Sequence, residues 1–385
     1  MPILGQPPSF SQTTLGTTHK RIRSIDFARF YGMILVYYGH IVEQVMYAGS
    51  AEAAAQYKFI YSFHMPLFFF LSGTIVAEKK LALPLLQYCK QILASRLVPY
   101  IFFSILTAIV SLAIPGWFPL GALNDAGGYL KSAIATLIGF PAFCIPLWFM
   151  ALLISVELFH ALISRVTQRL SILVVLAVIL YVCGYYLNQL YNFVENQQAF
   201  WFINEVPVIY LFYVAGVLLQ KSGFLHRDFP RRWTLPGALL CFLLVALTFD
   251  LNQGPFRIIQ AVVIVLSGHG NIVLFPLTAF LGSFFILFAA VGTPAAGWIS
   301  YLGQNALSLF CLNGLFYHFV NPVTATWFAK ACTTSHATVF LYSTLMTVLS
   351  LAVCLPLIFL LTRYVPQLMG KPMHEGPLLR PLIKK

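Results

Sequence analysis

Charge is scarce in this sequence, and the scarcity decides the class of protein. Only 9% of the 385 residues are Asp, Glu, Lys or Arg, whereas 59% are hydrophobic and the mean hydropathy is +0.83. A soluble protein of this size needs a polar surface that so few polar residues cannot provide. The apolar runs have the length of bilayer-spanning helices and lack the short alternating segments of a membrane barrel. We therefore expect an all-α integral membrane protein.

Cysteine pairs and basic tracts are also missing. None of the seven cysteines forms a CxxC pair and most lie in apolar runs, so neither a zinc site nor a disulfide framework is predicted. The net charge is +12, yet the 23 Lys and Arg residues are scattered through short loops and form no long tract. This pattern argues against nucleic acid as a partner and is typical of the loops of a membrane protein.

Ten apolar runs are long enough to be membrane spans. We predict them at residues 27–46, 59–77, 97–114, 146–164, 170–187, 206–220, 233–249, 271–291, 302–320 and 339–361. With both termini in the cytoplasm, 18 of the 23 Lys and Arg residues fall on the cytoplasmic side and four on the other. This bias supports ten spans and cytoplasmic termini. The run 256–268 is short for a span, and whether it crosses or re-enters the membrane is left open.

The two ends of the chain differ in composition from the middle. Residues 1–24 are polar and rich in Gly, Pro, Ser and Thr, which predicts a disordered cytoplasmic tail without a cleavable signal peptide. Residues 25–363 form the predicted transmembrane domain, and residues 364–385 a basic cytoplasmic tail. The outer loop 115–145 is long and rich in Gly and Pro, and loops of such length are usually functional.

Ionisable residues inside the predicted spans are few, and each is costly in a bilayer. They are Arg29, His40, Glu43, His64, Glu157, His160 and His318. His160 and His318 lie near the ends of their spans and are interpreted as interfacial. Position alone leaves Arg29 open between ligand binding and an arginine that reaches for the interface, and leaves His64 open between helix packing and function. Glu157 lies well inside its span, so it is expected to face a cavity or a partner.

His40 and His64 are predicted to lie at similar depth. His40 follows Arg29 by eleven residues, about 16 Å along a helix, and so lies in the outer half of the first span. His64 lies near the outer end of the second span, which runs antiparallel to the first. The two imidazoles are therefore expected to face one cavity. Glu43 follows His40 by three residues on the same helix face, where its carboxylate is a candidate partner for the imidazole.

Five segments, spread in order over most of the chain, resemble motifs of one family. They are SIDFARFYGMILVYYGH, with an arginine, ten residues and a histidine, and then FHMPLFFFLSG, RLVPY, PLWFMALLISVELF and YLGQNALSLFCLNGLF. This set resembles the acyltransferase-3 family of membrane acyltransferases. The sequence departs from the family in lacking a second arginine next to Arg96, and in having Asn313 where a histidine is common.

The resemblance implies O-acylation of a carbohydrate hydroxyl, with acyl-CoA, usually acetyl-CoA, as the co-substrate and no metal. It implies a multi-pass protein of the cell (inner or plasma) membrane, in contact with the lipid bilayer. The acceptor would be a polysaccharide, such as an exopolysaccharide, or a lipid-linked glycan. The sequence leaves open which acceptor is used, acetyl against succinyl or longer groups, direct transfer against a covalent relay, and the oligomeric state, including a homo-oligomer.

Roles for individual residues follow from this resemblance and from their chemistry. A positioned imidazole can take the proton of a sugar hydroxyl, so the catalytic group is His40 as general base, Glu43 to orient it, and His64 to align the acceptor or polarise the thioester. An anionic donor needs cations, so the residues assigned to acyl-CoA are Arg29, Arg96 and Lys90. The residues assigned to substrate binding are Trp148 and Glu157.

A proton-coupled transporter of a saccharide is the alternative class, because His and Glu inside a membrane also suit proton relays. Many transporters carry internal repeats, and no repeat is found in this sequence. The sequence therefore favours the enzyme over the transporter.

Overall fold

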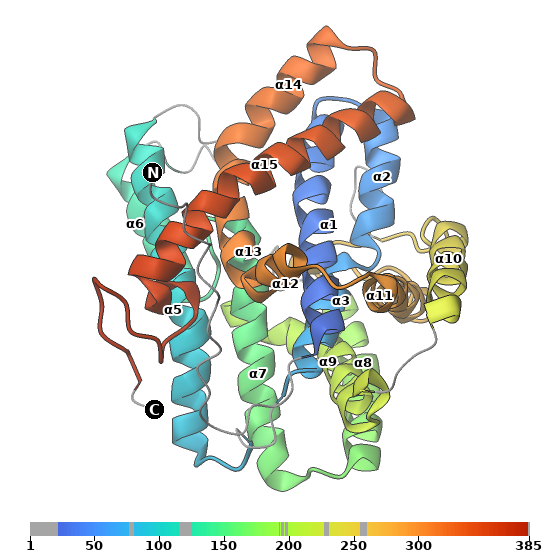
Figure 1. The fold of residues 1–385 in the computed structure, drawn as a ribbon, viewed down its shortest axis with the longest axis vertical. Helices are drawn as coiled ribbons and strands as arrows, with labels where there is room; N and C mark the ends of the chain where they lie inside the picture. Colours follow the sequence, from blue (N-terminus) through green and yellow to red (C-terminus); the bar gives the residue numbers. More distant parts are fainter. Residues whose placement is uncertain are drawn as a thin grey trace, which may run out of the picture.

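The computed structural model describes residues 22–76, 81–114, 123, 125–191, 193, 196, 199–226, 231–254 and 260–383. This part of the chain is helical and contains a single isolated β-bridge in place of any strand, which confirms the all-α class (Figure 1). The predicted N-terminal tail, except for its last three residues, lies outside the described residues. So do most of the loop segment 115–124 and the start of the run 256–268.

The main helices follow one another along the chain with short connections. They are α1 (Arg23–Tyr47), α2 (Ala51–Tyr61), α3 (His64–Gly73), α5 (Leu85–Ala113), α6 (Ala126–Leu137), α7 (Trp148–Val166), α8 (Leu170–Leu190), α9 (Val206–Lys221), α10 (Arg231–Thr248), α11 (Leu274–Gly292), α12 (Gly297–Gln304), α13 (Ala306–Leu315), α14 (Asn321–Ala331) and α15 (His336–Tyr364). A π-helix, η6 (Phe316–Val320), joins α13 to α14, and the 3-10 helices η3 (Phe200–Glu205) and η7 (Pro366–Met369) precede α9 and follow α15.

Seven helical stretches in the described part are long and apolar enough to cross a membrane. They are residues 85–113, 145–166, 170–190, 200–221, 274–292, 306–331 and 336–364. The protein is therefore a multi-pass membrane protein by composition and helix length. The count of ten spans and the side on which the termini lie remain predictions.

The second predicted span is divided in the structure. α2 ends at Tyr61, and α3 begins at His64 after a two-residue turn. Pro66 explains the position of the break, because proline is tolerated in the first turn of a helix but disrupts a longer one from within. The break brings His64 to the start of a helix, a place where its side chain can bond to the preceding turn.

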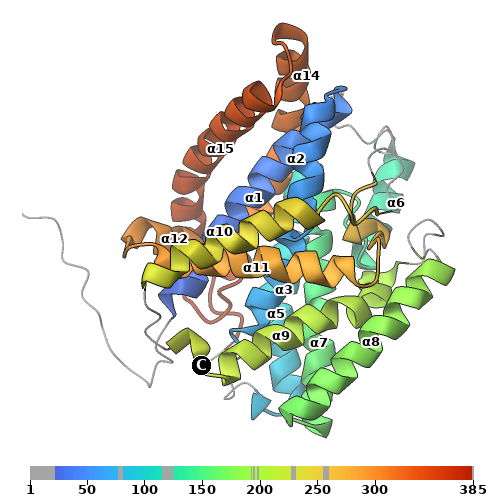
Figure 2. The same cartoon turned by 90° about the vertical axis from the view of Figure 1, so that its right-hand side faces the viewer.

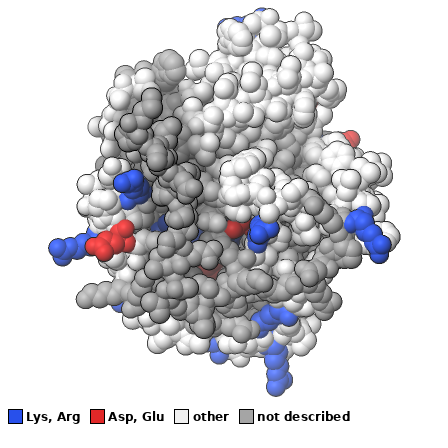
Figure 3. All heavy atoms as spheres, in the orientation of Figure 1, with Lys and Arg blue, Asp and Glu red and all other residues white. Residues whose placement is uncertain are grey.

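α1 runs through the middle of the protein. It packs against α2, α3 and α11 to α15, and most of its residues are buried (Figures 1 and 2). Of the ionisable residues on α1, Asp26, His40 and Glu43 are buried among these helices, whereas Arg29 is half-buried. On the face drawn in Figure 3, the Lys and Arg side chains gather in the lower half, whereas the region of α14 and α15 above is almost uncharged apart from its tip.

Candidate active site

His40 is held by an asparagine of a distant helix. Its Nδ1 lies 2.5 Å from Oδ1 of Asn313 on α13, and its ring packs edge-on against Tyr317, with centroids 4.8 Å apart. Because the amide oxygen accepts, Nδ1 carries the proton and Nε2 carries a lone pair. Nε2 has no hydrogen-bond partner among the described residues, and it is not one of the fully buried polar atoms. The basic nitrogen of His40 therefore keeps its lone pair unused by the protein, although the residue as a whole is only 8% exposed.

His64 has the same arrangement. Its Nδ1 lies 2.9 Å from the carbonyl oxygen of Ile60 in the last turn of α2, an oxygen that also accepts the backbone N–H of Phe63, and its ring packs against Tyr61. Nε2 of His64 again has no partner among the described residues and is not fully buried. The ring of Tyr317 packs against both His40 and His318, and Tyr61, which packs on His64, bonds to Glu43 one turn after His40, so the three imidazoles lie in one region.

Glu43 is surrounded by tyrosines. Its carboxylate accepts hydrogen bonds from the hydroxyls of Tyr47 at 3.2 Å, Tyr61 at 3.0 Å and Tyr317 at 3.4 Å. Within the described residues, His40 bonds to Asn313 and not to Glu43, so the expected direct pairing is wrong. The reason is that the hydroxyls of Tyr61 on α2 and Tyr317 on η6 already occupy hydrogen-bonding positions of the carboxylate. Tyr317 touches both groups, since its ring packs on His40 and its hydroxyl reaches Glu43.

The π-helix η6 shapes this region. π-helices are rare and often occur at functional sites. Here η6 carries Tyr317 and His318, directly after the α13 turn that carries Asn313. His318 is 1% exposed, and its Nε2 accepts a hydrogen bond from the backbone N–H of Ile145. His160 is also 1% exposed and bonds to the hydroxyl of Tyr210. The interfacial interpretation of these two histidines is therefore wrong, because neighbouring helices cover both.

A small cavity lies near the other end of α1. Its volume is about 180 Å³, and its lining includes Arg29 of α1, Arg96 of α5 and Lys371 of the C-terminal segment. Arg96 forms a two-pronged ion pair with Glu157 of α7, with Nη2 to Oε1 at 3.0 Å and Nε to Oε2 at 3.3 Å. The pair fixes the guanidinium at the cavity wall, so three cations from three elements face one small space. We call this space the cationic cavity.

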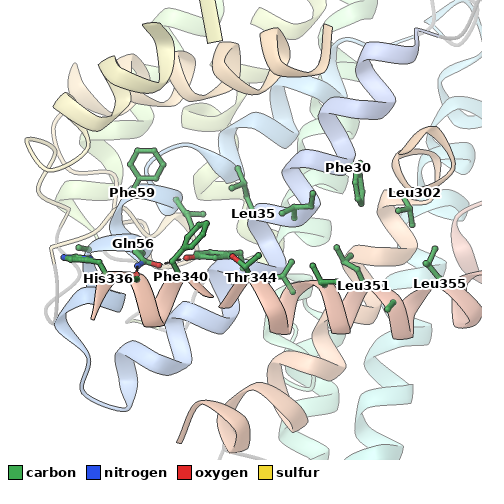
Figure 4. A pocket seen from close by; sticks show the side chains of 18 of the residues that line it. Phe30, Leu35, Gln56, Phe59, Leu302, His336, Phe340, Thr344, Leu351 and Leu355 are labelled. Carbon is green, nitrogen blue, oxygen red and sulfur yellow. Dashed lines mark hydrogen bonds between the residues drawn. The ribbon is translucent and has the colours of Figure 1, made fainter. Parts of the chain in front are cut away.

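A larger, apolar cavity of about 1160 Å³ lies between α1, α2, α12 and α15 (Figure 4). Its lining is mostly aliphatic and aromatic; Gln56 and His336 lie at one end and Thr344 near the middle. Neither His40 nor any of the three cations lines it. We therefore do not assign this apolar cavity as the active site, although it is the larger of the two.

The comparisons with known proteins decide the family. The family profile described as "Acyltransferase domain", that of the acyltransferase-3 family, matches residues 22–359. The chain belongs to the acyltransferase-3 family. This confirms the resemblance seen in the five motifs and makes the protein a membrane acyltransferase by family.

One curated relative gives a partial match. Over 110 residues the chain is 32% identical to the nodulation protein NolL of Mesorhizobium japonicum, which covers 28% of this chain and 29% of that protein. The match thus spans under a third of the length of that protein. No solved structure gives a significant match.

Two residues assigned from the sequence lie apart from these cavities. Lys90 is exposed on α5, six residues before Arg96, and does not line the cationic cavity. Trp148 begins α7 and is buried, with its ring edge-on to Phe202. Glu157 contacts Arg96, so any effect it has on a ligand passes through that arginine.

Two residues that contact His40 in the structure were assigned no role from the sequence. Asn313 and Tyr317 escaped assignment, although Asn313 is a polar residue in an apolar run and that alone is a signal. A second buried polar contact was also not expected, between Glu205 and His269, which are fully buried with Oε2 and Nε2 2.7 Å apart. Glu205 directly precedes the predicted span 206–220, and His269 lies in the loop before the predicted span 271–291, so both are outside the apolar runs.

Proposed function

We propose that this protein transfers an acyl group from acyl-CoA to a hydroxyl of a cell-surface or lipid-linked carbohydrate. The acyl group that we propose is acetyl. The observation that carries the proposal is the pair of sites on α1. One is a histidine whose Nδ1 is held by Asn313, which leaves the lone pair of Nε2 for chemistry, and the other, about 16 Å along the helix, is a cavity lined by three cations. The first site offers a general base to a neutral hydroxyl, and the second offers positive charge to the phosphates of the donor. With the termini in the cytoplasm of a cell (inner or plasma) membrane, the cationic cavity faces the CoA pool.

The chemistry at His40 follows from its tautomer. Nε2 takes the proton of the acceptor hydroxyl as its oxygen attacks the thioester carbonyl carbon, the carbon–sulfur bond breaks, and the proton passes to the departing CoA thiolate. Asn313 keeps the Nδ1–H in place and stabilises the imidazolium that forms, as the orienting group does in a catalytic triad. His64 also presents a lone pair at Nε2, so it can accept a hydrogen bond from the acceptor but cannot donate one to the thioester carbonyl. This favours alignment of the acceptor as its role.

The donor side uses charge. Arg29 and Arg96 have the fork geometry that suits phosphate oxygens, and Glu157 holds Arg96 in one orientation before the donor arrives. On the acceptor side, Glu43 and the rings of Tyr61 and Tyr317 offer a carboxylate and aromatic faces beside His40. Substrate binding by Trp148 stays a prediction.

The test of the function is transfer by the purified protein. We expect free CoA thiol to appear from acetyl-CoA only when a carbohydrate acceptor is supplied, and labelled acetyl to appear on that acceptor. Cell-surface glycans from cells without the gene should lack the corresponding acetyl mass. Movement of a labelled saccharide across proteoliposomes with no acyl transfer would instead establish the transporter.

Asn313 gives a more specific prediction. Asn313→Ala removes the acceptor of the Nδ1–H bond, so we expect kcat to fall about a hundredfold with little change in either KM. Asn313→Asp keeps an oxygen at this position and should recover activity to within a few fold. Steady-state kinetics with both substrates measures this split. Equal losses in the two variants would show that Asn313 matters only for packing.

A further inference from the structure

The segment after α15 folds back on the helices. Gln367 is fully buried, and its side-chain amide donates to the carbonyls of His374 and Leu379, both at 2.7 Å. The backbone N–H of Leu378 bonds to the carbonyl of Tyr364, the last residue of α15. These bonds close residues 365–383 into a compact unit, which we call the C-terminal cap. It lies beside α5 (Figure 1).

The C-terminal cap fits closely against α5 and α13. Gly370 has a φ of +76°, and a Cβ placed there would lie 2.6 Å from the side chain of Leu307 and 2.8 Å from the carbonyl oxygen of Ser95. Only glycine suits both the backbone conformation and this approach. The next residue, Lys371, is therefore held at a defined place, and its Nζ donates to Oδ1 of Asn305 at 2.9 Å.

Lys371 lines the same cavity as Arg29 and Arg96. Among the described residues that line it, none is Asp or Glu, and most of the others are apolar. Like charges held together in a mostly apolar space repel one another, and an anionic ligand in that space would offset the repulsion. The arrangement suits a ligand with several negative charges.

We propose that the C-terminal cap is the closing wall of the donor site, and that Lys371 binds a phosphate of acyl-CoA. This deepens the proposed function and rests on it. Arg29 and Arg96 offer fixed forks, whereas the lysine is a point charge on a flexible stem that can leave Asn305 and follow the phosphate. The CoA diphosphate and the 3′-phosphate share this chemistry, so the donor must be varied to tell them apart.

The test compares Lys371→Gln with Lys330→Gln, an exposed lysine in the last turn of α14 that does not line the cavity. We expect Lys371→Gln to raise the KM for acetyl-CoA about tenfold or more, with kcat and the acceptor KM within twofold of the wild type. Lys371→Arg should recover most of the loss. The same loss with 3′-dephospho-acetyl-CoA as donor would assign the lysine to the diphosphate, and no loss with that donor would assign it to the 3′-phosphate.

Two outcomes would overturn the proposal. An unchanged KM for acetyl-CoA in active Lys371→Gln protein would show that the lysine is not a ligand. Parallel losses in kcat, acceptor KM and unfolding temperature would show that it serves only the fold. If the wild type transfers no acyl group, the proposed function fails, and the shift of the unfolding temperature by CoA still decides the site. A shift as large in Lys371→Gln as in Lys330→Gln would then reject Lys371.

Discussion

Acyl transfer should be lost when His40 is replaced by glutamine, with kcat for acetyl-CoA falling on the order of a thousandfold. Glutamine has a similar length, and its amide N–H can donate to Asn313 as Nδ1–H does. The packing around α1 is therefore kept. What disappears is the basic nitrogen, and no amide can take a proton from a hydroxyl at neutral pH. Release of CoA thiol and labelled acetyl on the acceptor measure the loss.

His160→Gln is the matched control for this variant. His160 is as buried as a site histidine, and its Nδ1 also bonds to a side-chain oxygen, the hydroxyl of Tyr210. It belongs to the α7–α9 packing and not to the region of His40. We expect its activity to stay within a few fold of the wild type at permissive temperature. Full activity in well-folded His40→Gln protein would remove His40 from the mechanism.

The sequence was sufficient to find the helix that carries the site. Arg29 and His40 are costly in an apolar run, and the distance between them follows from the rise of a helix. The partner of His40 could not be predicted, because Asn313 is 273 residues away in the sequence and the pairing depends on how α1 packs against α13. For the same reason Glu43 was paired with the nearest imidazole in sequence, whereas hydroxyls from other helices reach it in space.

The ends of helices were harder to predict than their middles. Pro66 favours the start of a helix near His64, but the complete break between α2 and α3 depends on how both pieces pack on α1. Lys371 has the sequence signature of a basic tail. Only the close approach of Gly370 to α5 and α13 places it in the cationic cavity. Local composition carries no information on such contacts.

The ion pair between Arg96 and Glu157 should allow the effect of Arg96 on stability to be distinguished from its effect on donor binding. The side chains are 20% and 10% exposed, so removal of either charge leaves the other in a largely buried place. We expect Arg96→Gln and Glu157→Gln each to lower the free energy of unfolding by about 3 kcal/mol. The double variant replaces both charges with amides that can bond to each other, and it should recover most of that stability. Denaturation in detergent measures these differences.

Donor binding should not recover with stability. Arg96→Gln removes a cation from the cationic cavity, so the KM for acetyl-CoA should rise about tenfold or more, and the double variant should keep this rise. The pair of Lys58 and Asp250, at 2.7 Å, is the control, because Asp250 is 74% exposed and neither residue lines the cavity. Neutralising that pair should change stability and the KM little. If the double variant instead regains the wild-type KM, Arg96 supports only the packing of α5 on α7, and the donor is held by other cations.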